Sequence, residues 1–188
     1  ERRRSVRYHQ TILVSCEIPW DDGDNLLEEV FRKEIRSVLK MGFNDLYIFG
    51  TAGEGYAVDS HQFRRIVEIF RGETDKEGLH PQVGVIDLST SRILERIGFA
   101  HHLGFRAFQI SLPCWGALND KELLTFFEDV CGAFPDSKFL HYNLPRARRV
   151  LTANDYQRIA DEVPNLAATK NFGVNAHEVV RLMKKVPE

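Results

Sequence analysis

Short apolar runs alternate with longer amphipathic segments along the chain, and no other sequence feature constrains the fold as strongly. The apolar runs have the length of buried strands: Thr11–Cys16, Asp45–Phe49, Gln82–Ile86, Arg106–Ser111, Lys138–Tyr142 and Leu166–Lys170. The intervening segments predict helices at residues 25–41, 59–72, 90–103, 119–132, 152–163 and 175–186. Six strand–helix units among 188 residues give about 31 residues per unit, which is the size of a βαβ repeat. The alternation therefore predicts an α/β fold with a parallel sheet and right-handed crossovers.

Two architectures fit such an alternation, an open doubly wound sheet and a (β/α)8 TIM barrel. A doubly wound nucleotide-binding protein usually carries G-x-G-x-x-G after its first strand, but here that strand leads into Glu17–Gly23. The glycine cluster Gly50–Gly55 follows the second strand and has a different spacing. The sequence thus favours the barrel, as a single domain over residues 1–188. Because a barrel has eight units and about 250 residues, we expect the last two units and the C-terminal helices to be missing.

Local signals predict where several segments begin and which faces they bury. Thr152 is a candidate N-cap, as is Asp59 or Ser60 before the second helix. The polar segment Gly72–Pro81 is expected to be a surface loop. In the first helix, apolar residues at helical spacing predict one buried stripe: Leu27, Val30, Phe31, Ile35, Val38 and Leu39.

Composition excludes several classes of protein. With a net charge of −2 and a hydrophobic fraction of 43%, the chain is typical of a globular protein and gives no reason to expect nucleic acid as a partner. No apolar run approaches the roughly 20 residues of a membrane-spanning helix, so no membrane partner is expected. Three scattered cysteines, Cys16, Cys114 and Cys131, exclude a disulfide framework and a cysteine zinc site. They fit a reducing compartment, so a cytoplasmic location is expected. A start at Glu1 without methionine indicates a processed or trimmed N-terminus.

Lys170 is the most informative residue for chemistry. Catalytic residues of a barrel lie at the C-terminal ends of its strands, and Lys170 ends an otherwise apolar strand. Desolvation there favours the neutral amine, which is the nucleophile that attacks a ketone to form a Schiff base. Tyr142 ends the neighbouring strand, about 5 Å away, and its phenol could transfer protons. The alternatives are a lysine that extends to water and a tyrosine that belongs to the core.

Two further groups lie at the same predicted end of the barrel. Gly50–Gly55 offers backbone N–H groups near a helix start, which suit a carboxylate, although many loops have this composition. Arg146, Arg148 and Arg149 follow the fifth strand and could bind a substrate carboxylate, or they could be solvated surface charges. The N-terminal arginines Arg2, Arg3, Arg4 and Arg7 are expected to form a solvated arm.

Other chemistries find little support. The seven histidines include no pair at metal-ligand spacing on a strand end, which disfavours a metal-dependent aldolase; we expect neither metal nor cofactor. No serine lies in a G-x-S-x-G elbow, which removes the common hydrolase reading.

Together these positions resemble the dihydrodipicolinate synthase / N-acetylneuraminate lyase family of class I aldolases. Three motifs carry the resemblance in the expected order: Gly50–Glu54 for the GTTGE-like loop, Tyr142–Pro145 for the YN-x-P turn, and Lys170. The resemblance implies a lysine Schiff base with pyruvate or a related 2-oxo acid, on Lys170, with Tyr142 and Thr51 as further catalytic residues. It also implies that Gly50, Thr51, Ala52 and Gly53 bind the substrate carboxylate. A homo-oligomer, tetramer or dimer, is implied as well.

Three positions depart from the family pattern. Ala52 replaces the second threonine of the loop, and Trp115 replaces a tyrosine of the proton relay, so the relay is rebuilt or unnecessary. We expect the ring of Trp115 to give the pocket an apolar cover. Ala147 stands where the synthases have a substrate-binding arginine, with Arg146 and Arg148 on either side. These departures disfavour lysine synthesis and favour a lyase or dehydratase acting on a sugar acid or hydroxy-oxo-acid.

Three functions remain open from the sequence. The first is a Schiff-base aldolase or lyase that releases or condenses pyruvate. The second is a dehydratase that uses the same imine on a deoxy-oxo sugar acid. The third is a degenerate member that binds a 2-oxo acid or a protein partner without turnover.

Overall fold

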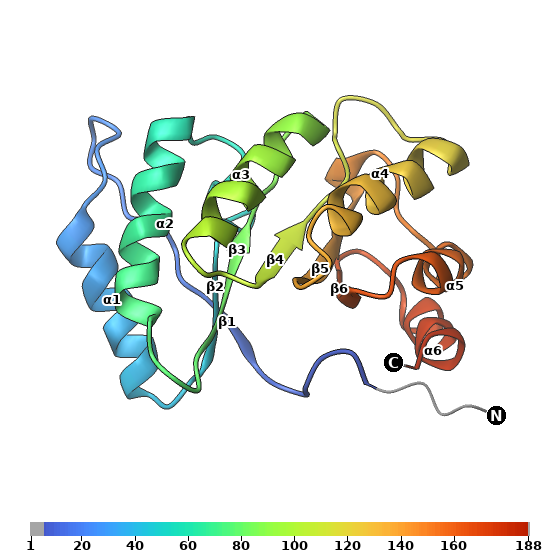
Figure 1. The fold of residues 1–188 in the computed structure, drawn as a ribbon, viewed down its shortest axis with the longest axis horizontal. Coiled ribbons are helices and arrows are strands. Elements are labelled where there is room, and N and C mark those ends of the chain that lie inside the picture. Colours follow the sequence, from blue (N-terminus) through green and yellow to red (C-terminus); the bar gives the residue numbers. More distant parts are fainter. Residues whose placement is uncertain (1–5, 188) are drawn as a thin grey trace. The chain divides into compact units, whose positions relative to one another are not determined.

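A computed structural model describes residues 6–187, in which strands and helices alternate as the sequence predicts (Figure 1). The elements follow one another as β1 (Leu13–Ser15), α1 (Glu28–Lys40), β2 (Asp45–Ile48), α2 (Ser60–Thr74), β3 (His80–Gly84), α3 (Thr90–His102), β4 (Ala107–Ile110), α4 (Asp120–Gly132), β5 (Lys138–Asn143), the short 3-10 helix η1 (Pro145–Ala147), α5 (Ala153–Glu162), β6 (Leu166–Asn171) and α6 (Ala176–Lys185). All predicted strands and helices are present, with ends that differ by a few residues.

The strand pairs β1–β2, β2–β3, β3–β4 and β5–β6 are parallel, and the strands follow the order of the chain. Parallel strands in chain order, each followed by a helix, are the arrangement of the (β/α)8 barrel, of which six units are present here. The predicted fold class is therefore confirmed.

The chain forms two compact units. The N-terminal unit contains residues 11–86 and 95–109, with strands β1 to β4 up to Gln109. The C-terminal unit contains residues 6–10, 87–94 and 110–187, with β5, β6 and helices α4 to α6. None of the described helices is long and apolar enough to cross a membrane.

In the N-terminal unit, helices α1 and α2 lie side by side along the strands (Figure 1). Helix α1 buries Phe31, Ile35 and Val38, but Leu27 is 39% and Val30 is 51% exposed, so the predicted stripe is wrong at these two positions. Val30 lies one residue before this i, i+4, i+7 row, and about 100° per residue turns it away from the contact.

The predicted surface loop Gly72–Pro81 is also wrong at both of its ends. Helix α2 continues to Thr74, because Glu73 receives hydrogen bonds from Arg32 and Arg36 of α1 and the Thr74 hydroxyl donates to the Phe70 carbonyl. These arginines, Arg36 foremost, lower the pKa of the Glu73 carboxyl. At the other end, β3 already begins at His80. Tertiary contacts therefore extend both elements into a polar sequence.

In the C-terminal unit, Arg7 is not part of a solvated arm. Its guanidinium donates to the carbonyl oxygens of Ala160, Val163 and Leu166 at 2.8–3.0 Å, which ties the N-terminal segment to the end of α5 and the start of β6. Carbonyls at a helix C-terminus have no partner within the helix, so a guanidinium there satisfies several at once. Arg2, Arg3 and Arg4 lie outside the described residues.

The predicted helix starts are confirmed where they were assigned. Thr152 caps α5 and Asp59, not Ser60, caps α2, each in a reciprocal capping box with the side chain three residues later. Capping satisfies backbone N–H groups that would otherwise lack partners at the ends of the strand–helix loops. These loops carry the candidate site.

Candidate active site

In the C-terminal unit, the structure brings Lys170 and Tyr142 together. The two residues are register partners on parallel strands β6 and β5, so their side chains share one face of the strand pair. The Lys170 Nζ lies 4.2 Å from the centroid of the Tyr142 ring, over its face. Tyr142 is buried and Lys170 is half-buried. A cation over a phenol ring is an attractive contact that holds the amine at this position.

This partnership depends on an irregularity in the pairing of the two strands. Phe139 pairs with Leu166, but the next residue, Leu140, pairs with Ala168, so Ala167 is an extra residue in β6. Such a β-bulge shifts the register by one residue and changes which side chains lie next to one another. Beyond it, His141 pairs with Thr169, Tyr142 with Lys170, and Asn143 with Asn171.

The face opposite Lys170 carries a polar network that the sequence reasoning missed. The Thr169 hydroxyl donates to the Tyr156 oxygen of α5 at 2.7 Å, and this phenol also contacts Nδ1 of His141 at 2.7 Å. Since Tyr156 accepts from Thr169, its own proton is directed at His141 Nδ1. His141 is buried and packs edge-to-face on Phe127, and burial lowers its pKa to about 3, so the ring is neutral. Burial likewise raises the pKa of the Tyr156 phenol.

The hydrogen bonds of Asn143 give a structural reason for an asparagine after Tyr142. It is fully buried, its amide donates to the Leu151 carbonyl and to Oδ1 of Asn171, and its own Oδ1 accepts from the Leu151 N–H. The side chain therefore holds the loop 144–151 against the strand ends. A polar residue ending an apolar strand was a signal for this role that the sequence contained.

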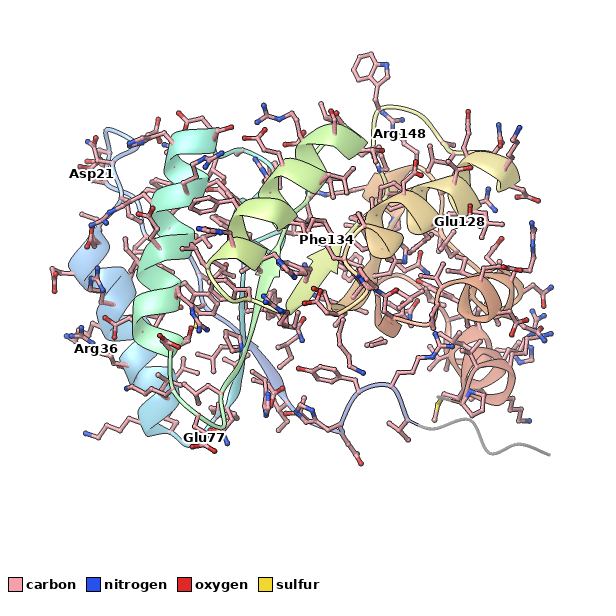
Figure 2. All side chains as sticks on the ribbon, viewed as in Figure 1. Asp21, Arg36, Glu77, Glu128, Phe134 and Arg148 are labelled. Carbon is pink, nitrogen blue, oxygen red and sulfur yellow. The ribbon has the colours of Figure 1, made fainter. Side chains whose placement is uncertain are left out.

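The three arginines of that loop have different roles. Arg149 donates to the Leu118 carbonyl and to the carboxylates of Asp120 and Asp155, so it anchors the loop to α4 and α5 and is occupied. Arg146 and Arg148 are exposed, and neither side chain makes a hydrogen bond or ion pair within residues 6–187. Arg148, labelled in Figure 2, has a left-handed backbone (φ 62°) where it ends η1. Ala147 between them is buried.

In the N-terminal unit, the loop Gly50–Gly55 follows β2 through a sharp turn. Phe49 has a left-handed backbone (φ 64°), as does Glu54 (φ 51°). The close approach requires glycine at position 84, since a Cβ there would lie 2.3 Å from the Phe49 carbonyl oxygen. Within the described residues, the N–H groups of Gly50, Thr51, Ala52 and Gly53 donate to no backbone acceptor, which leaves them available to an anion.

A buried arginine fixes the far end of this loop. The guanidinium of Arg96 donates to the carbonyls of Gly55, Ile86 and Val58 at 2.6–3.0 Å and lies 4.9 Å from the centroid of Phe63. Arg96 is therefore a structural support of the loop that its sequence context, an amphipathic helix, did not indicate.

The two buried cysteines, Cys16 and Cys131, do not support thiol chemistry. The Glu17 N–H donates to the Glu34 carboxylate, whose pKa is raised by burial and by the charge of Glu17. Burial and these two carboxylates raise the pKa of Cys16 to about 12, so it is a neutral thiol at pH 7. Burial also raises the pKa of Cys131. Neither group is a ready nucleophile.

Two further residues complete the comparison with the sequence. Trp115 is 87% exposed, which contradicts the expectation of an apolar cover: the ring is in solvent, because the loop after β4 does not fold it inward. Ala52 is exposed at the turn of the Gly50–Gly55 loop.

In the part of the chain that the structure describes, no group of three or more His, Cys, Asp or Glu side chains could hold a metal ion.

The fold and the residues at its strand ends define the class of protein: an α/β-barrel chain with a lysine and a tyrosine paired at the ends of neighbouring strands. Residues 9–188 match the model of the dihydrodipicolinate synthetase family, and the chain belongs to this family.

Curated relatives agree with this membership. The chain is 25% identical to a 4-hydroxy-tetrahydrodipicolinate synthase of Thermus thermophilus over 146 residues, which are 77% of this chain and 48% of that protein. It is 28% identical to N-acetylneuraminate lyase B of Xenopus laevis over 151 residues, 73% of this chain and 53% of that protein. The chain thus spans about half the length of these relatives.

Solved structures share the fold. A family member of Escherichia coli K12, the prophage protein YagE in complex with pyruvate, superposes with a TM-score of 0.88 at 17% identity, over 94% of this chain and 59% of that one. Family membership and fold are thereby established for this chain, and the family's curated members include synthases and lyases.

The neutral, buried His141 predicts a pH dependence of stability. Its pKa is lower in the folded state than the ordinary 6.5, so the unfolded chain binds the extra proton and stability falls as the pH drops below about 6.5. From pH 6.5 to about pH 5, this group alone is expected to cost about 2 kcal/mol. Urea unfolding of the wild type and of His141→Gln at both pH values isolates the effect, because Glu34, which titrates with the opposite sign, is common to both. Equal pH slopes in the two proteins would contradict the prediction.

Proposed function

We propose that this protein is a class I aldolase or lyase that forms a Schiff base between Lys170 and pyruvate or a related 2-oxo acid, and cleaves or condenses a hydroxy-oxo-acid or sugar acid. The observation that carries the proposal is the contact of the Lys170 amine with the ring of Tyr142 at the ends of β6 and β5. Membership of a family that includes such lyases supports it.

The chemistry follows from an amine beside a phenol. The Lys170 amine, once it has given up its proton, attacks the ketone carbon, and the carbinolamine loses water to give the imine. The imine withdraws electrons from the adjacent carbon, so a carbon–carbon bond there can break or form. Tyr142 carries protons to and from the carbinolamine oxygen and the substrate. No external oxidant or cofactor is required by these steps.

The proposal assigns the substrate carboxylate to the loop after β2. The unoccupied backbone N–H groups of Gly50, Thr51, Ala52 and Gly53 are donors of the kind that bind a carboxylate, and Thr51 adds a hydroxyl for the proton relay. Ala52 contributes only its backbone. We further expect a cytoplasmic location, from the three scattered cysteines, and a homo-oligomer, which the family resemblance implies and whose size light scattering would measure.

Trapping with borohydride tests the imine directly. Reduction in the presence of pyruvate should fix one pyruvate on Lys170, located by mass spectrometry of peptides from the intact protein. Lys170→Met should abolish the adduct, whereas Lys138→Met, which alters the lysine at the opposite end of β5, should retain it. An adduct on another lysine would show that Lys170 is not the Schiff-base residue. The absence of any adduct would favour a degenerate member that binds without turnover. Product analysis with sugar acids distinguishes the aldolase from the dehydratase.

Replacing Tyr142 with phenylalanine tests the proton carrier. The ring and its packing against the Lys170 amine are retained, so the free energy of unfolding should barely change. Turnover should fall by roughly 10²–10⁴-fold, the usual contribution of a positioned general acid–base group. A variant with the wild-type rate would show that Tyr142 is a core residue.

Arg146 and Arg148 are the candidates for binding the distal part of the substrate, because both are exposed and make no ion pair within residues 6–187. A charge-assisted contact to a carboxylate corresponds to an increase in KM of about 10–150-fold when the arginine is removed. We expect this increase in Arg146→Ala or Arg148→Ala for an acid with a distal carboxylate, with trapping of pyruvate unchanged. Arg158→Ala, at an exposed arginine of α5, is the control. Unchanged KM in both variants would make these side chains solvated surface charges.

A further inference from the structure

The proposed site depends on the register of β5 and β6, and this register is marked by side chains on the face opposite Lys170. With Ala167 as an extra residue, His141 lies opposite Thr169 and Asn143 lies opposite Asn171. Both pairs are polar and both are bonded, the first through the Tyr156 hydroxyl and the second directly at 2.9 Å. The amide of Asn171 also lies 3.4 Å from the Thr169 hydroxyl, so the contacts form one connected network.

The alternative register shows what the bulge changes. If the pairing of Phe139 with Leu166 continued without interruption, Tyr142 would lie opposite Thr169, and Lys170 would turn to the face that packs on α5. His141 would then lie opposite Ala168, which has no hydroxyl. The Lys170 ammonium would point into the buried layer between β6 and α5, where no carboxylate of the network could pair with it, and a buried charge without a partner is costly.

We infer that Tyr156, with the pairs His141–Thr169 and Asn143–Asn171, is a positioning device that selects the shifted register and thereby holds Lys170 beside Tyr142. The inference rests on the proposed function for its catalytic consequence. None of these five side chains is required to touch the substrate. They act through the strands, since each of the two candidate catalytic residues is flanked on both sides by members of the network.

Burial makes the network selective. His141 and Asn143 are almost completely buried, and a buried polar group without a partner costs more than an ordinary hydrogen bond contributes. The Tyr156 hydroxyl accepts from Thr169 of β6 and is directed at Nδ1 of His141 in β5, so one phenol oxygen links the two strands in this register. A slip of one residue would break both pairs at once, so the two strands have one favoured alignment.

A disulfide measures the register without any catalysis. The double variant Tyr142→Cys/Lys170→Cys, with Cys114→Ser to remove the half-exposed native thiol, should oxidise readily, because register partners bring the two Cα atoms within the roughly 4.4–6.8 Å that a disulfide needs. Adding Tyr156→Phe and Asn171→Ala should lower the yield of the 142–170 bridge about 10-fold. Adding Thr74→Val, which removes a buried hydroxyl of α2, should leave the yield unchanged. An unchanged yield with Tyr156→Phe and Asn171→Ala would overturn the inference.

A conservative pair at Thr169 tests the catalytic consequence and covers the case in which the combined variant does not fold. Thr169→Val removes the hydroxyl but keeps the branched shape, and Thr169→Ser keeps the hydroxyl. The rate of borohydride trapping at saturating pyruvate should fall about 10-fold in Thr169→Val and recover in Thr169→Ser. A purely structural role would lower the unfolding midpoint and leave this rate unchanged below it, which would contradict the inference. If the wild type traps no pyruvate while the disulfide yields behave as expected, the proposed function fails and the register device stands.

Discussion

The alignment of two neighbouring strands is the constraint on which the candidate site depends. Side chains alternate between the two faces of a strand, so a displacement of one residue in β6 would exchange every inward side chain for an outward one. The bulge at Ala167 places Lys170 opposite Tyr142 and on the same face, so that its amine lies over the Tyr142 ring. A lysine at a strand end can simply extend into solvent. Here the contact with a buried phenol on the adjacent strand gives the side chain a defined position.

The two faces of the β5–β6 pair have different roles: one carries the candidate catalytic side chains, and the other carries the side chains that align the strands. One face presents the amine and the phenol, and the other contains a chain of hydrogen bonds from Asn143 through Asn171, Thr169 and Tyr156 to His141. The network is held in a neutral state, because burial lowers the pKa of His141 and raises that of Tyr156. A neutral imidazole is tolerated here although its Nε2 has no hydrogen-bond partner among the described residues, whereas an ionised group in the same layer would need a counter-charge.

Arginine side chains, one buried and two half-buried, stabilise the irregular segments of both units. Arg96 donates to three carbonyls around the loop after β2, Arg149 anchors the loop after β5, and Arg7 closes the end of α5. Loops contain backbone carbonyls that no helix or strand satisfies, and an arginine can donate to several of them from one fixed plane. This leaves Arg146 and Arg148 as the arginines of the loop 144–151 without such a task, which is why the proposed substrate contact is assigned to them.

The sequence by itself determined the alternation of strands and helices and the barrel class, and it named the candidate site residues Lys170, Tyr142 and Gly50–Gly53. Hydrophobic periodicity and short motifs are local properties that a linear pattern records. It missed Tyr156, His141 and Arg96, whose partners lie far away in the chain and become visible only when elements pack. Its errors at Arg7, Val30, Trp115 and Gly72–Pro81 have the same origin: exposure and the exact ends of helices are set by contacts between elements. The tertiary structure alone decided the register of β5 and β6. Ala167 is followed by a second alanine, so nothing in the sequence marks it as the extra residue. Only the pairing of the two folded strands places the bulge there.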